Sequence, residues 1–404
     1  MNTNQVLLGD CLEIIKHIES ESIDLIYLDP PFFTQRTHKL ATKDNTKEYS
    51  FTDKWDNINA YKDYIQERLL ECQRTLKATG SIFLHCDKTA SHYLRFALDE
   101  VFGYSNFQSE IIWTYRRWSN SKKGLLNSHQ TIFFYSKTDS FKFNQKYDNY
   151  SPSTNLDQIF QERERVSNGK SKYKTDQNGE VVYSQSKKGV PLGDTWDIPF
   201  LNPKAKERVG YPTQKPILLL EKIIELTTNE NDLILDPFCG SGTTLVAAKL
   251  LNRQFLGIDK SEDAVELAKQ RVLKPFKTNS NLLENGRETY LTKDEKTLEI
   301  LKQIGAVPVQ RNKGIDGFLS QNGRIQAIPI KIQKFDETFE EAKLALLNAG
   351  KNSNYKTMIL LSLQGKKEDA LFEQILPTDN IIVAFDLDQI KNFDFISRSI
   401  DNLI

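Results

Sequence analysis

The sequence is poor in sulfur, contains no long apolar run, and has no excess of either charge. Its 404 residues include 2 methionines and 4 cysteines. The cysteines form no Cys-x-x-Cys pair, which argues against a disulfide framework or a zinc knuckle and fits a reducing compartment. No run of about 18 apolar residues occurs, and no basic stretch at the N-terminus leads into an apolar one. We therefore expect a cytoplasmic protein with no membrane partner.

The charge balance does not by itself indicate nucleic-acid binding. The chain has 54 basic and 54 acidic residues, so any affinity for DNA must come from local clusters. Arg116 and Arg117 lie among Trp113, Tyr115 and Trp118, and these residue types contact phosphates and stack on bases. The lysine clusters are typical of solvated faces when taken singly; they lie at residues 122–123, 170–174, 187–188 and 204–208.

Apolar runs of strand length alternate with helical spacing in two blocks of the chain. The first block predicts strands at residues 24–28, 81–85, 110–115 and 131–135, and helices at 58–77 and 90–102. The second predicts helices at residues 217–227, 243–251 and 261–273, and strands at 232–235 and 254–258. This alternation predicts one α/β domain, residues 1–278, with a Rossmann-like, mostly parallel sheet.

A polar insert of about residues 140–205 separates the two blocks. Its composition leaves open a separately folded segment or a long disordered loop, although Tyr183, Trp196 and Phe200 indicate packing. Residues 290–404 predict a small second α/β domain, with a helix at 339–349 between strands.

The turn from Asp236 to Thr243 reads Asp-Pro-Phe-Cys-Gly-Ser-Gly-Thr between a predicted strand and helix. Small residues let the backbone approach a ligand, and the helix start presents free N–H groups. No Gly-Lys-Ser/Thr follows, and the third glycine of the dinucleotide fingerprint is absent. Asp259 ends the next strand, where a carboxylate can accept from ribose hydroxyls. The pair predicts a nucleoside cofactor without a buried pyrophosphate; the alternative is a structural turn.

Asp29-Pro30-Pro31-Phe32 follows another predicted strand, the place where open α/β sheets carry active sites. An exocyclic base amine is a poor nucleophile because its lone pair is delocalised. The Asp29 carboxylate and the Pro30 carbonyl could each accept an amino hydrogen, and Pro31 stiffens that carbonyl. Phe32 would stack on a base that has left the duplex.

These two motifs, in this order, resemble the amino-group DNA methyltransferases of the β class. The resemblance covers residues 5–275 and is supported by further matches: Leu8-Gly9-Asp10-Cys11, Gly210-Tyr211-Pro212-Thr213-Gln214-Lys215-Pro216, and segments 80–87 and 129–135. It implies a site-specific enzyme that moves a methyl group from S-adenosylmethionine to adenine N6 in double-stranded DNA, within a restriction-modification system. It also implies that the insert includes the target-recognition region.

The resemblance assigns site residues by motif. The catalytic residues would be Asp29, Pro30, Pro31 and Phe32. Asp10 and Cys11 would lie near the cofactor's adenine. The remaining cofactor-binding residues would be Pro212, Thr213, Lys215, Asp236, Phe238, Gly240, Gly242, Thr243 and Asp259. We expect no metal, because His85, Cys86, Asp87 and His92 show no regular ligand spacing and the chemistry needs none. His38 is expected in a loop over the base or the DNA backbone.

The target base, the partners and the reaction class each have alternatives. Phe32 stands where many adenine-specific members have Tyr, which leaves cytosine N4 open, whereas Asp29 stands where many cytosine-N4 members have Ser. A cognate restriction endonuclease and a second copy of the chain are further candidate partners. An RNA base methyltransferase would recognise unstacked bases in loops, and nothing here resembles an added RNA-binding module. A non-catalytic DNA-binding partner would not need the intact Asp29 motif.

The C-terminal region resembles the core of restriction-endonuclease-like domains. Those nucleases hold a metal with an Asp after one strand and with an acidic or Gln residue two positions before a Lys on the next. Here Asp316 is present, but Pro329 stands two before Lys331, and a shifted register puts Gln333 where Lys is required. We expect a degenerate nuclease fold used for DNA contact or dimerisation; the alternative is an unrelated α/β domain.

Overall fold

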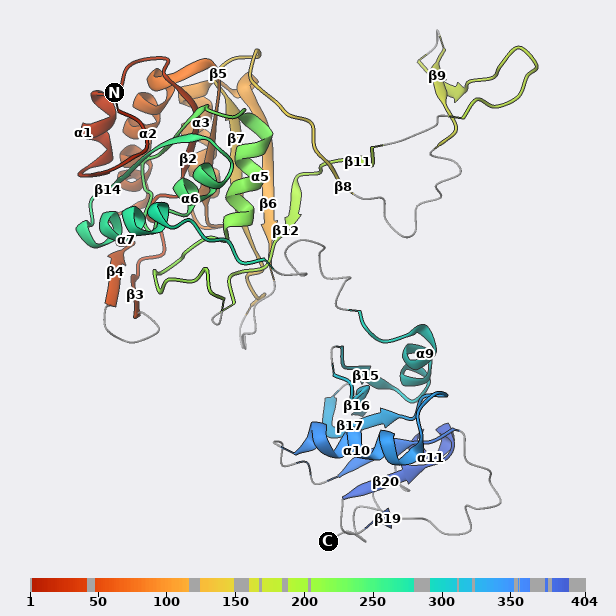
Figure 1. The fold of residues 1–404 in the computed structure, drawn as a ribbon. Coiled ribbons are helices and arrows are strands. Elements are labelled where there is room, and N and C mark those ends of the chain that lie inside the picture. The colour runs from red at the N-terminus through yellow and green to blue at the C-terminus, as the bar shows by residue number, and fades with distance from the viewer. Residues whose placement is uncertain are drawn as a thin grey trace. The chain divides into compact units, whose positions relative to one another are not determined.

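The chain forms two compact units, residues 1–283 and 284–404, each described by itself (Figure 1). The structure is a computed structural model, and it describes residues 2–41, 48–115, 124–148, 160–166, 169–183, 188–202, 205–279, 291–310, 312–321, 324–351, 355, 357–363, 375–376 and 380–391. In these parts of the chain, no helix combines the length and the apolar character that a membrane crossing requires.

An eight-stranded sheet is the centre of the first unit, in the order β1-β14-β13-β2-β5-β7-β6-β12. Its strands are β1 (Gln5–Leu8), β2 (Ile23–Leu28), β5 (Leu76–Cys86), β6 (Phe107–Thr114), β7 (His129–Ser136), β12 (Thr195–Asp197), β13 (Leu233–Asp236) and β14 (Gln254–Asp259). The five strands from β1 to β5 in this order run parallel, and β7 is antiparallel to both of its neighbours. The predicted Rossmann-like, mostly parallel sheet is confirmed.

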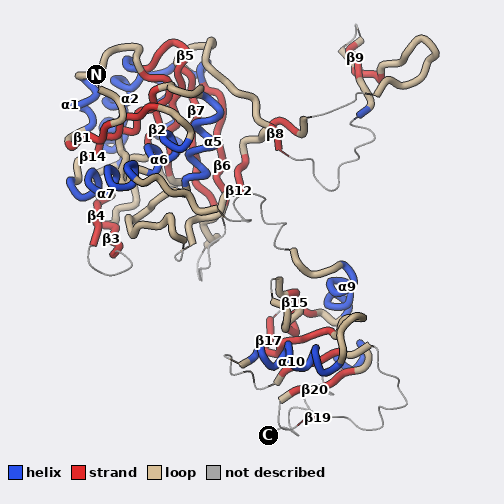
Figure 2. The backbone as a smooth tube through the Cα atoms, in the orientation of Figure 1, coloured by secondary structure: helices blue, strands red, loops and turns tan. Residues whose placement is uncertain are grey.

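Helices cover both faces of this sheet (Figure 2). One face carries α1 (Cys11–Lys16), α2 (Ile58–Thr75) and α3 (Ser91–Phe102), and the other carries α5 (Ile217–Thr227), α6 (Thr243–Leu250) and α7 (Glu262–Leu273). Every residue of β2 is buried, and its side chains alternate between two cores: Leu25 and Tyr27 pack with the second set of helices, Ile26 and Leu28 with the first. Apart from Asp24, this strand carries only aliphatic and aromatic side chains, as expected for a strand that is covered on both faces.

Two segments depart from the sequence expectations. β5 begins at Leu76, so residues 77–80, expected to end a helix, form part of a strand whose pairing with β2 shifts register. β12 of the insert joins the main sheet beside β6, and Trp196 is buried there, whereas Tyr183 is exposed. The edge of the sheet supplies Trp196 with apolar neighbours, which composition alone could not reveal.

Elsewhere in the first unit, the described residues form three short strand pairs and a 3-10 helix, η1 (Tyr104–Asn106). β3 (Thr37–Ala41) pairs with β4 (Glu48–Thr52), β8 (Tyr147–Asp148) with β11 (Val190–Pro191), and β9 (Arg163–Arg165) with β10 (Ser171–Tyr173). Of the basic clusters, residues 116–118, 122–123, 187 and 204 lie outside the described residues.

The second unit is built on a sheet of order β15-β16-β17-β18-β20-β19. Its elements are α9 (Glu295–Gln303), β15 (Ala306–Pro308), β16 (Gly317–Gln321), β17 (Arg324–Ile332), α10 (Phe339–Gly350), β18 (Met358–Leu361), β19 (Ile375–Leu376), β20 (Ile381–Ala384) and α11 (Leu387–Lys391). β16 and β17 form an antiparallel pair, and β17, β18 and β20 run parallel.

Candidate active site at the carboxyl edge of the parallel strands

The chemistry-bearing motifs meet at one edge of the large sheet. Asp29 follows β2, Asp236 ends β13, and Asp259 ends β14. These strands are parallel neighbours, so their carboxyl ends lie side by side. A cavity of about 490 Å³ opens at this edge, a size that suits a small-molecule site.

Most of the site residues expected from the sequence line this cavity. They are Cys11, Asp29, Pro30, Pro31, Phe32, Pro212, Thr213, Lys215, Asp236, Phe238, Gly240, Thr243 and Asp259. Two others are not among its lining residues. Asp10 instead caps α1 by accepting from the Leu12 amide at 2.9 Å and is held by Arg68 at 3.0 Å. Gly242 faces α7, where an added Cβ would lie 2.7 Å from the Cβ of Ala268.

Asp29 and Lys215 form an ion pair inside the cavity, between the Lys215 Nζ and the Asp29 Oδ2. The Lys215 side chain is only 6% exposed, and its Nζ lies 5.4 Å from the centre of the Phe32 ring. Burial raises the pKa of Asp29, and the Lys215 ammonium opposes that shift. The lysine from the segment before α5 therefore touches both the expected acceptor and the expected stacking ring.

His85 is a fully buried residue behind Asp29 that the sequence did not assign to the reaction. Burial, with the nearby Lys215 charge, holds the His85 pKa well below its ordinary value, so the ring is neutral. The Tyr27 hydroxyl lies 2.8 Å from Nδ1, and Gln130 Oε1 lies 3.0 Å from Nε2. The tautomer that fits accepts from Tyr27 and donates to Gln130. The His85 ring centre is 5.8 Å from that of Phe32, so His85 also packs against the last residue of the Asp29–Phe32 motif.

The expectation of no metal concerned His85 and its neighbours. Within the described ranges, no three His, Cys, Asp or Glu side chains are arranged to hold a metal ion. His85 instead makes the two hydrogen bonds above.

Two carboxylates hold the glycine turn in shape: Asp236 at its start and Asp259 at the end of β14. Asp259 accepts from the Gly240 amide at 2.9 Å and from the Ser261 amide at 2.8 Å, and Asp236 accepts from the Phe238 amide at 3.1 Å. Burial raises the pKa of Asp259, and it raises that of Asp236 to about 7. Both acidic groups thus lie in a weakly solvated wall where a cationic ligand would be favoured.

Arg271, in the neighbouring helix α7, hydrogen-bonds to this turn. Its Nη1 donates to the Ser241 carbonyl at 2.7 Å and to the Thr243 hydroxyl at 3.1 Å. No motif marks Arg271 in the sequence, because it lies in an ordinary amphipathic helix and reaches the turn only after folding.

The β3–β4 hairpin forms a further wall of the cavity that the sequence did not predict. Phe51, Asp53 and Trp55 line the cavity, and Phe51 stacks on Tyr211 with 6.4 Å between ring centres. His38 lies in β3, not in a loop as expected, and its Nε2 is 3.0 Å from Asp53 Oδ2. The alternation of Tyr49 and Phe51 along the chain was the available signal.

The residues singled out in the C-terminal unit form a closed charge cluster. Asp316 accepts from Lys293 Nζ at 2.5 Å and from the Ile332 amide at 2.7 Å. Lys331, which is 1% exposed, pairs with Glu337 at 2.8 Å. The structure therefore brings Asp316 and Lys331 together, but each already has a partner from the chain itself.

The fold of the first unit is that of the S-adenosylmethionine-dependent methyltransferases, and comparisons with known proteins give the family. The chain matches the N6/N4 methyltransferase family, described as DNA methylase, over residues 23–270. It is 31% identical over 290 residues to the Type II methyltransferase M.HinfI of Haemophilus influenzae, covering 70% of this chain and 71% of that one. The corresponding figures for M.HpaI of Haemophilus parainfluenzae are 31% over 273 residues, 67% and 75%.

The chain belongs to this DNA methylase family: it is a DNA methyltransferase that acts on base amino groups. Among solved structures it is similar to the complex of M1.HpyAVI with S-adenosylmethionine, with a TM-score of 0.41, 21% identity, and coverage of 66% of this chain and 98% of that one.

S-adenosylmethionine is the cofactor of this reaction, and the residues of the cavity fit it. Its sulfonium and ammonium groups are cationic, and the carboxylates of Asp29, Asp236 and Asp259 line the cavity. The glycine turn lets a ligand approach the backbone, since Gly240 has a φ of +47° and an added Cβ would stand 3.0 Å from the Tyr211 ring.

Proposed function

We propose that this DNA methyltransferase modifies adenine N6 at a specific sequence of double-stranded DNA, as the modifying enzyme of a restriction-modification system. The observation that carries the proposal is that Asp29, Pro30 and Phe32 share one cavity with the glycine turn and Asp259. Adenine is favoured because Asp29 stands where many cytosine-N4 members of the family have Ser.

The residues of the cavity have separate roles in this reaction. The Asp29 carboxylate and the Pro30 carbonyl would accept hydrogen bonds from the two amino hydrogens, which draws electron density onto the nitrogen. As the N–C bond forms, the C–S bond of the sulfonium would break and its electron pair stay on sulfur, and the nitrogen would then release one hydrogen as a proton, with Asp29 as an acceptor within reach. Phe32 stacks on the base, which must leave the duplex to reach the cavity. Asp259 would accept from the hydroxyls of the cofactor's ribose, while Asp236 and the turn around Gly240 would hold its methionine part. Cys11 would lie near the cofactor's adenine.

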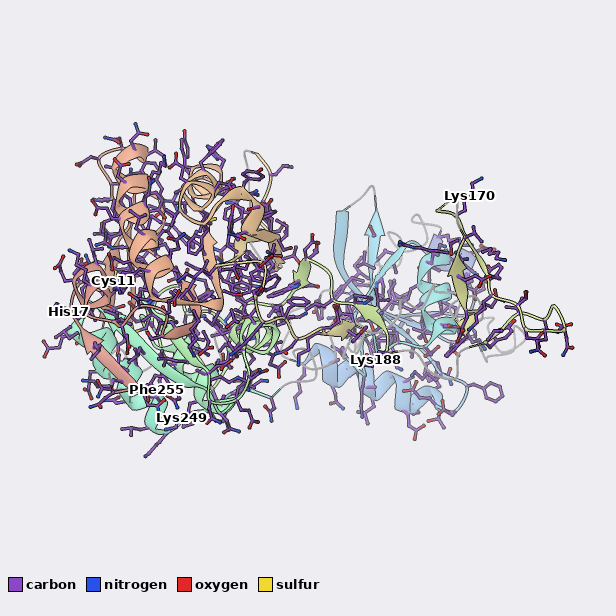
Figure 3. All side chains as sticks on the ribbon, turned by 90° about the horizontal axis from the view of Figure 1, so that it is seen from above. Cys11, His17, Lys170, Lys188, Lys249 and Phe255 are labelled. Atoms are coloured by element: carbon purple, nitrogen blue, oxygen red, sulfur yellow. The ribbon has the colours of Figure 1, made fainter. Side chains whose placement is uncertain are left out.

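We propose that the insert, about residues 140–205 of a methyltransferase domain spanning 1–278, recognises the target sequence. The described cations between residues 160 and 190 are exposed and include Lys170 and Lys188, which Figure 3 shows on the segment between β7 and α5. Arg163 lies over the Tyr173 ring, 4.8 Å from its centre, a pairing of the kind that contacts phosphates and bases. A cognate endonuclease and a second copy of the chain are the proposed protein partners.

For residues 290–404 we propose an accessory domain with a degenerate nuclease fold that contacts DNA or a second copy without cleaving. The support is the closed cluster around Asp316, in which Lys293 and the Ile332 amide hold the carboxylate. A metal ion would have to compete with both.

The test of the target base is mass spectrometry of nucleosides from duplex DNA incubated with methyl-labelled S-adenosylmethionine. We expect labelled N6-methyladenine from the wild type and from Lys249→Gln, a control at an exposed position of α6 (Figure 3). Asp29→Ala should lose at least about 100-fold in rate, because one of two fixed acceptors is gone. Labelled N4-methylcytosine would support the same transfer to an exocyclic amine but show that the target base is cytosine. Phe32, which lacks the hydroxyl of the Tyr found in many adenine-specific members, is compatible with that outcome. No label in any nucleoside would contradict the proposal.

A further inference from the structure

The two oxygens of the Asp29 carboxylate have different surroundings. Oδ2 is held by the Lys215 ammonium. Oδ1 lies 3.9 Å from His85 Nδ1, which is too far for a hydrogen bond, and that nitrogen already accepts from Tyr27. Among the described residues, none donates a hydrogen bond to Oδ1. One oxygen of the carboxylate is thus committed to the protein, while the other is available.

We propose that Lys215 is a positioning residue of the methyl transfer: it holds Oδ2 of Asp29 so that Oδ1 alone accepts the hydrogen of the target amino group. This inference rests on the proposed function and deepens it. The resemblance assigned Lys215 to cofactor binding, and a cofactor role alone would not require an ion pair with the acceptor of the target amine.

The energetics of the pair support this assignment. Asp29 lies in a cavity wall where burial disfavours its charged form, and the adjacent Lys215 ammonium favours it. A protonated carboxyl is a much weaker acceptor, so the lysine preserves the form that the reaction needs. Because Lys215 contacts Oδ2, it does not compete with the incoming amine for Oδ1.

Lys215 also fixes the geometry around the base. Its Nζ lies 5.4 Å from the centre of the Phe32 ring, so one buried side chain contacts both the acceptor and the stacking ring. Such a group restrains their relative position, and small displacements of reacting groups reduce rates strongly.

The experiment compares wild type, Lys215→Gln, Lys215→Arg and the surface control Lys249→Gln in the full chain. Single-turnover methyl transfer to duplex DNA is followed as a function of pH at saturating S-adenosylmethionine, and cofactor affinity is measured by calorimetry. We expect Lys215→Gln to lose about 100-fold in rate and to change cofactor affinity less than about threefold, because the interaction acts on the transition state. Lys215→Arg, which keeps a cation at Oδ2, should recover most of the rate.

The pH profile gives a second readout that a cofactor role would not move. The reaction requires ionised Asp29, so the rate rises with pH through the Asp29 pKa. Loss of the Lys215 cation raises that pKa, and the acidic limb of the Lys215→Gln profile should move to higher pH. A large loss of cofactor affinity with an unchanged limb and an unchanged rate at saturation would overturn the proposal.

A double-mutant cycle separates the loss of the ion pair from a general folding defect, which would lower the rate in both backgrounds. In an Asp29→Asn background the acceptor is neutral and needs no cation, so Lys215→Gln should change the residual rate by less than about twofold. An equal loss in both backgrounds would refute the assignment. The wild-type product tests the proposed function separately. If the wild type methylates no base, the proposed function is wrong. If it methylates a base but Lys215→Gln has the same effect in both backgrounds, only the role of Lys215 is wrong.

Discussion

At the scale of single residues, Asp236 is a buried carboxyl group in the wall of the cavity proposed for the cofactor. The carboxyl group is 2% exposed, and burial raises its pKa to about 7 despite hydrogen bonds from the Thr244 side chain and the Phe238 amide. A folded pKa above the unfolded value means that the folded state binds the proton more tightly. The contribution to stability is therefore full at low pH and is lost as pH rises toward and beyond 7.

Asp236→Asn should remove this pH dependence. We expect the variant, without cofactor, to be more stable than wild type at pH 7 by on the order of 3 kcal/mol and nearly equal to it at pH 4. Its affinity for cationic S-adenosylmethionine should fall by about tenfold, since a nearby negative charge is lost. Thermal unfolding at several pH values and a cofactor titration measure both effects. A variant less stable than wild type at pH 7 would contradict the assignment.

At the scale of elements, the turn between β13 and α6 depends on one glycine that does not touch the cavity. Gly242 has a φ of +75°, and an added Cβ would lie 2.7 Å from the Cβ of Ala268. The left-handed backbone and the close approach of α7 both exclude a side chain. The turn is thereby pressed against α7, where Arg271 can reach the Ser241 carbonyl.

Gly242→Ala should lower both stability and cofactor affinity. The strained backbone costs about 1–2 kcal/mol, and relief of the contact with α7 would shift the residues that line the cavity. Thermal unfolding and calorimetric titration test this, with Gly193→Ala as the matched control because nothing lies within 4 Å of an added Cβ there. Equal behaviour of the two variants would show that the turn tolerates a side chain.

A buried carboxylate joins several elements of the sheet at the edge opposite the active site. Asp24 of β2 accepts from Lys77 of β5 at 2.7 Å, from Lys142 at 2.8 Å, and from the Leu233 amide at 3.0 Å. Burial opposes ionisation, but these bonds prevail and lower the pKa of Asp24. The charged form is thus the one that stabilises the fold.

Asp24→Asn should destabilise the first unit by about 2 kcal/mol at pH 7. Because the pKa of Asp24 is depressed on folding, the difference from wild type should shrink as pH falls through that value. Tryptophan fluorescence during urea unfolding is a suitable probe, since all 4 tryptophans lie before residue 197. Asp139→Asn, at an exposed position, is the control, and equal unfolding of the two variants would contradict this role for Asp24.

At the scale of the whole molecule, two units carry two different arrangements of carboxylate and lysine. In the first unit, Asp29 lines the cavity, Lys215 holds its Oδ2, and no described residue donates a hydrogen bond to its Oδ1. In the second, Asp316 is 1% exposed, and its two oxygens are bound by Lys293 and by a backbone amide. An accessible acceptor supports chemistry, whereas a saturated one supports the fold.

We therefore expect the full chain to leave DNA uncut. Supercoiled plasmid incubated with the protein and Mg²⁺ or Mn²⁺ should stay supercoiled on an agarose gel, because Lys293 already neutralises Asp316. Nicking that disappears in Asp316→Ala would show that the second unit is an active nuclease and would refute the proposal of an accessory domain.

The local sequence was sufficient for the elements and motifs of the large sheet. The mostly apolar run of β2, the helical spacing of α5 and α7, and the turns after β2 and β13 each lie within a short window of sequence. Their patterns therefore predict a strand, a helix or a ligand-binding turn directly. The resemblance of these turns to one enzyme family also follows from contiguous residues, since each motif is a short run of neighbouring residues in the chain.

Only the tertiary structure decided which distant residues complete the site. Lys215 meets Asp29 across 186 positions of the chain. Strand order and helix packing also bring the β3–β4 hairpin to the cavity, His85 next to Asp29, and Arg271 to the glycine turn. Trp196 is buried because β12 joins the sheet beside β6. Such contacts join residues that are far apart in the sequence, and no local period or spacing signals them. The sequence by itself therefore determined the motifs, and the tertiary structure determined which distant residues contact them.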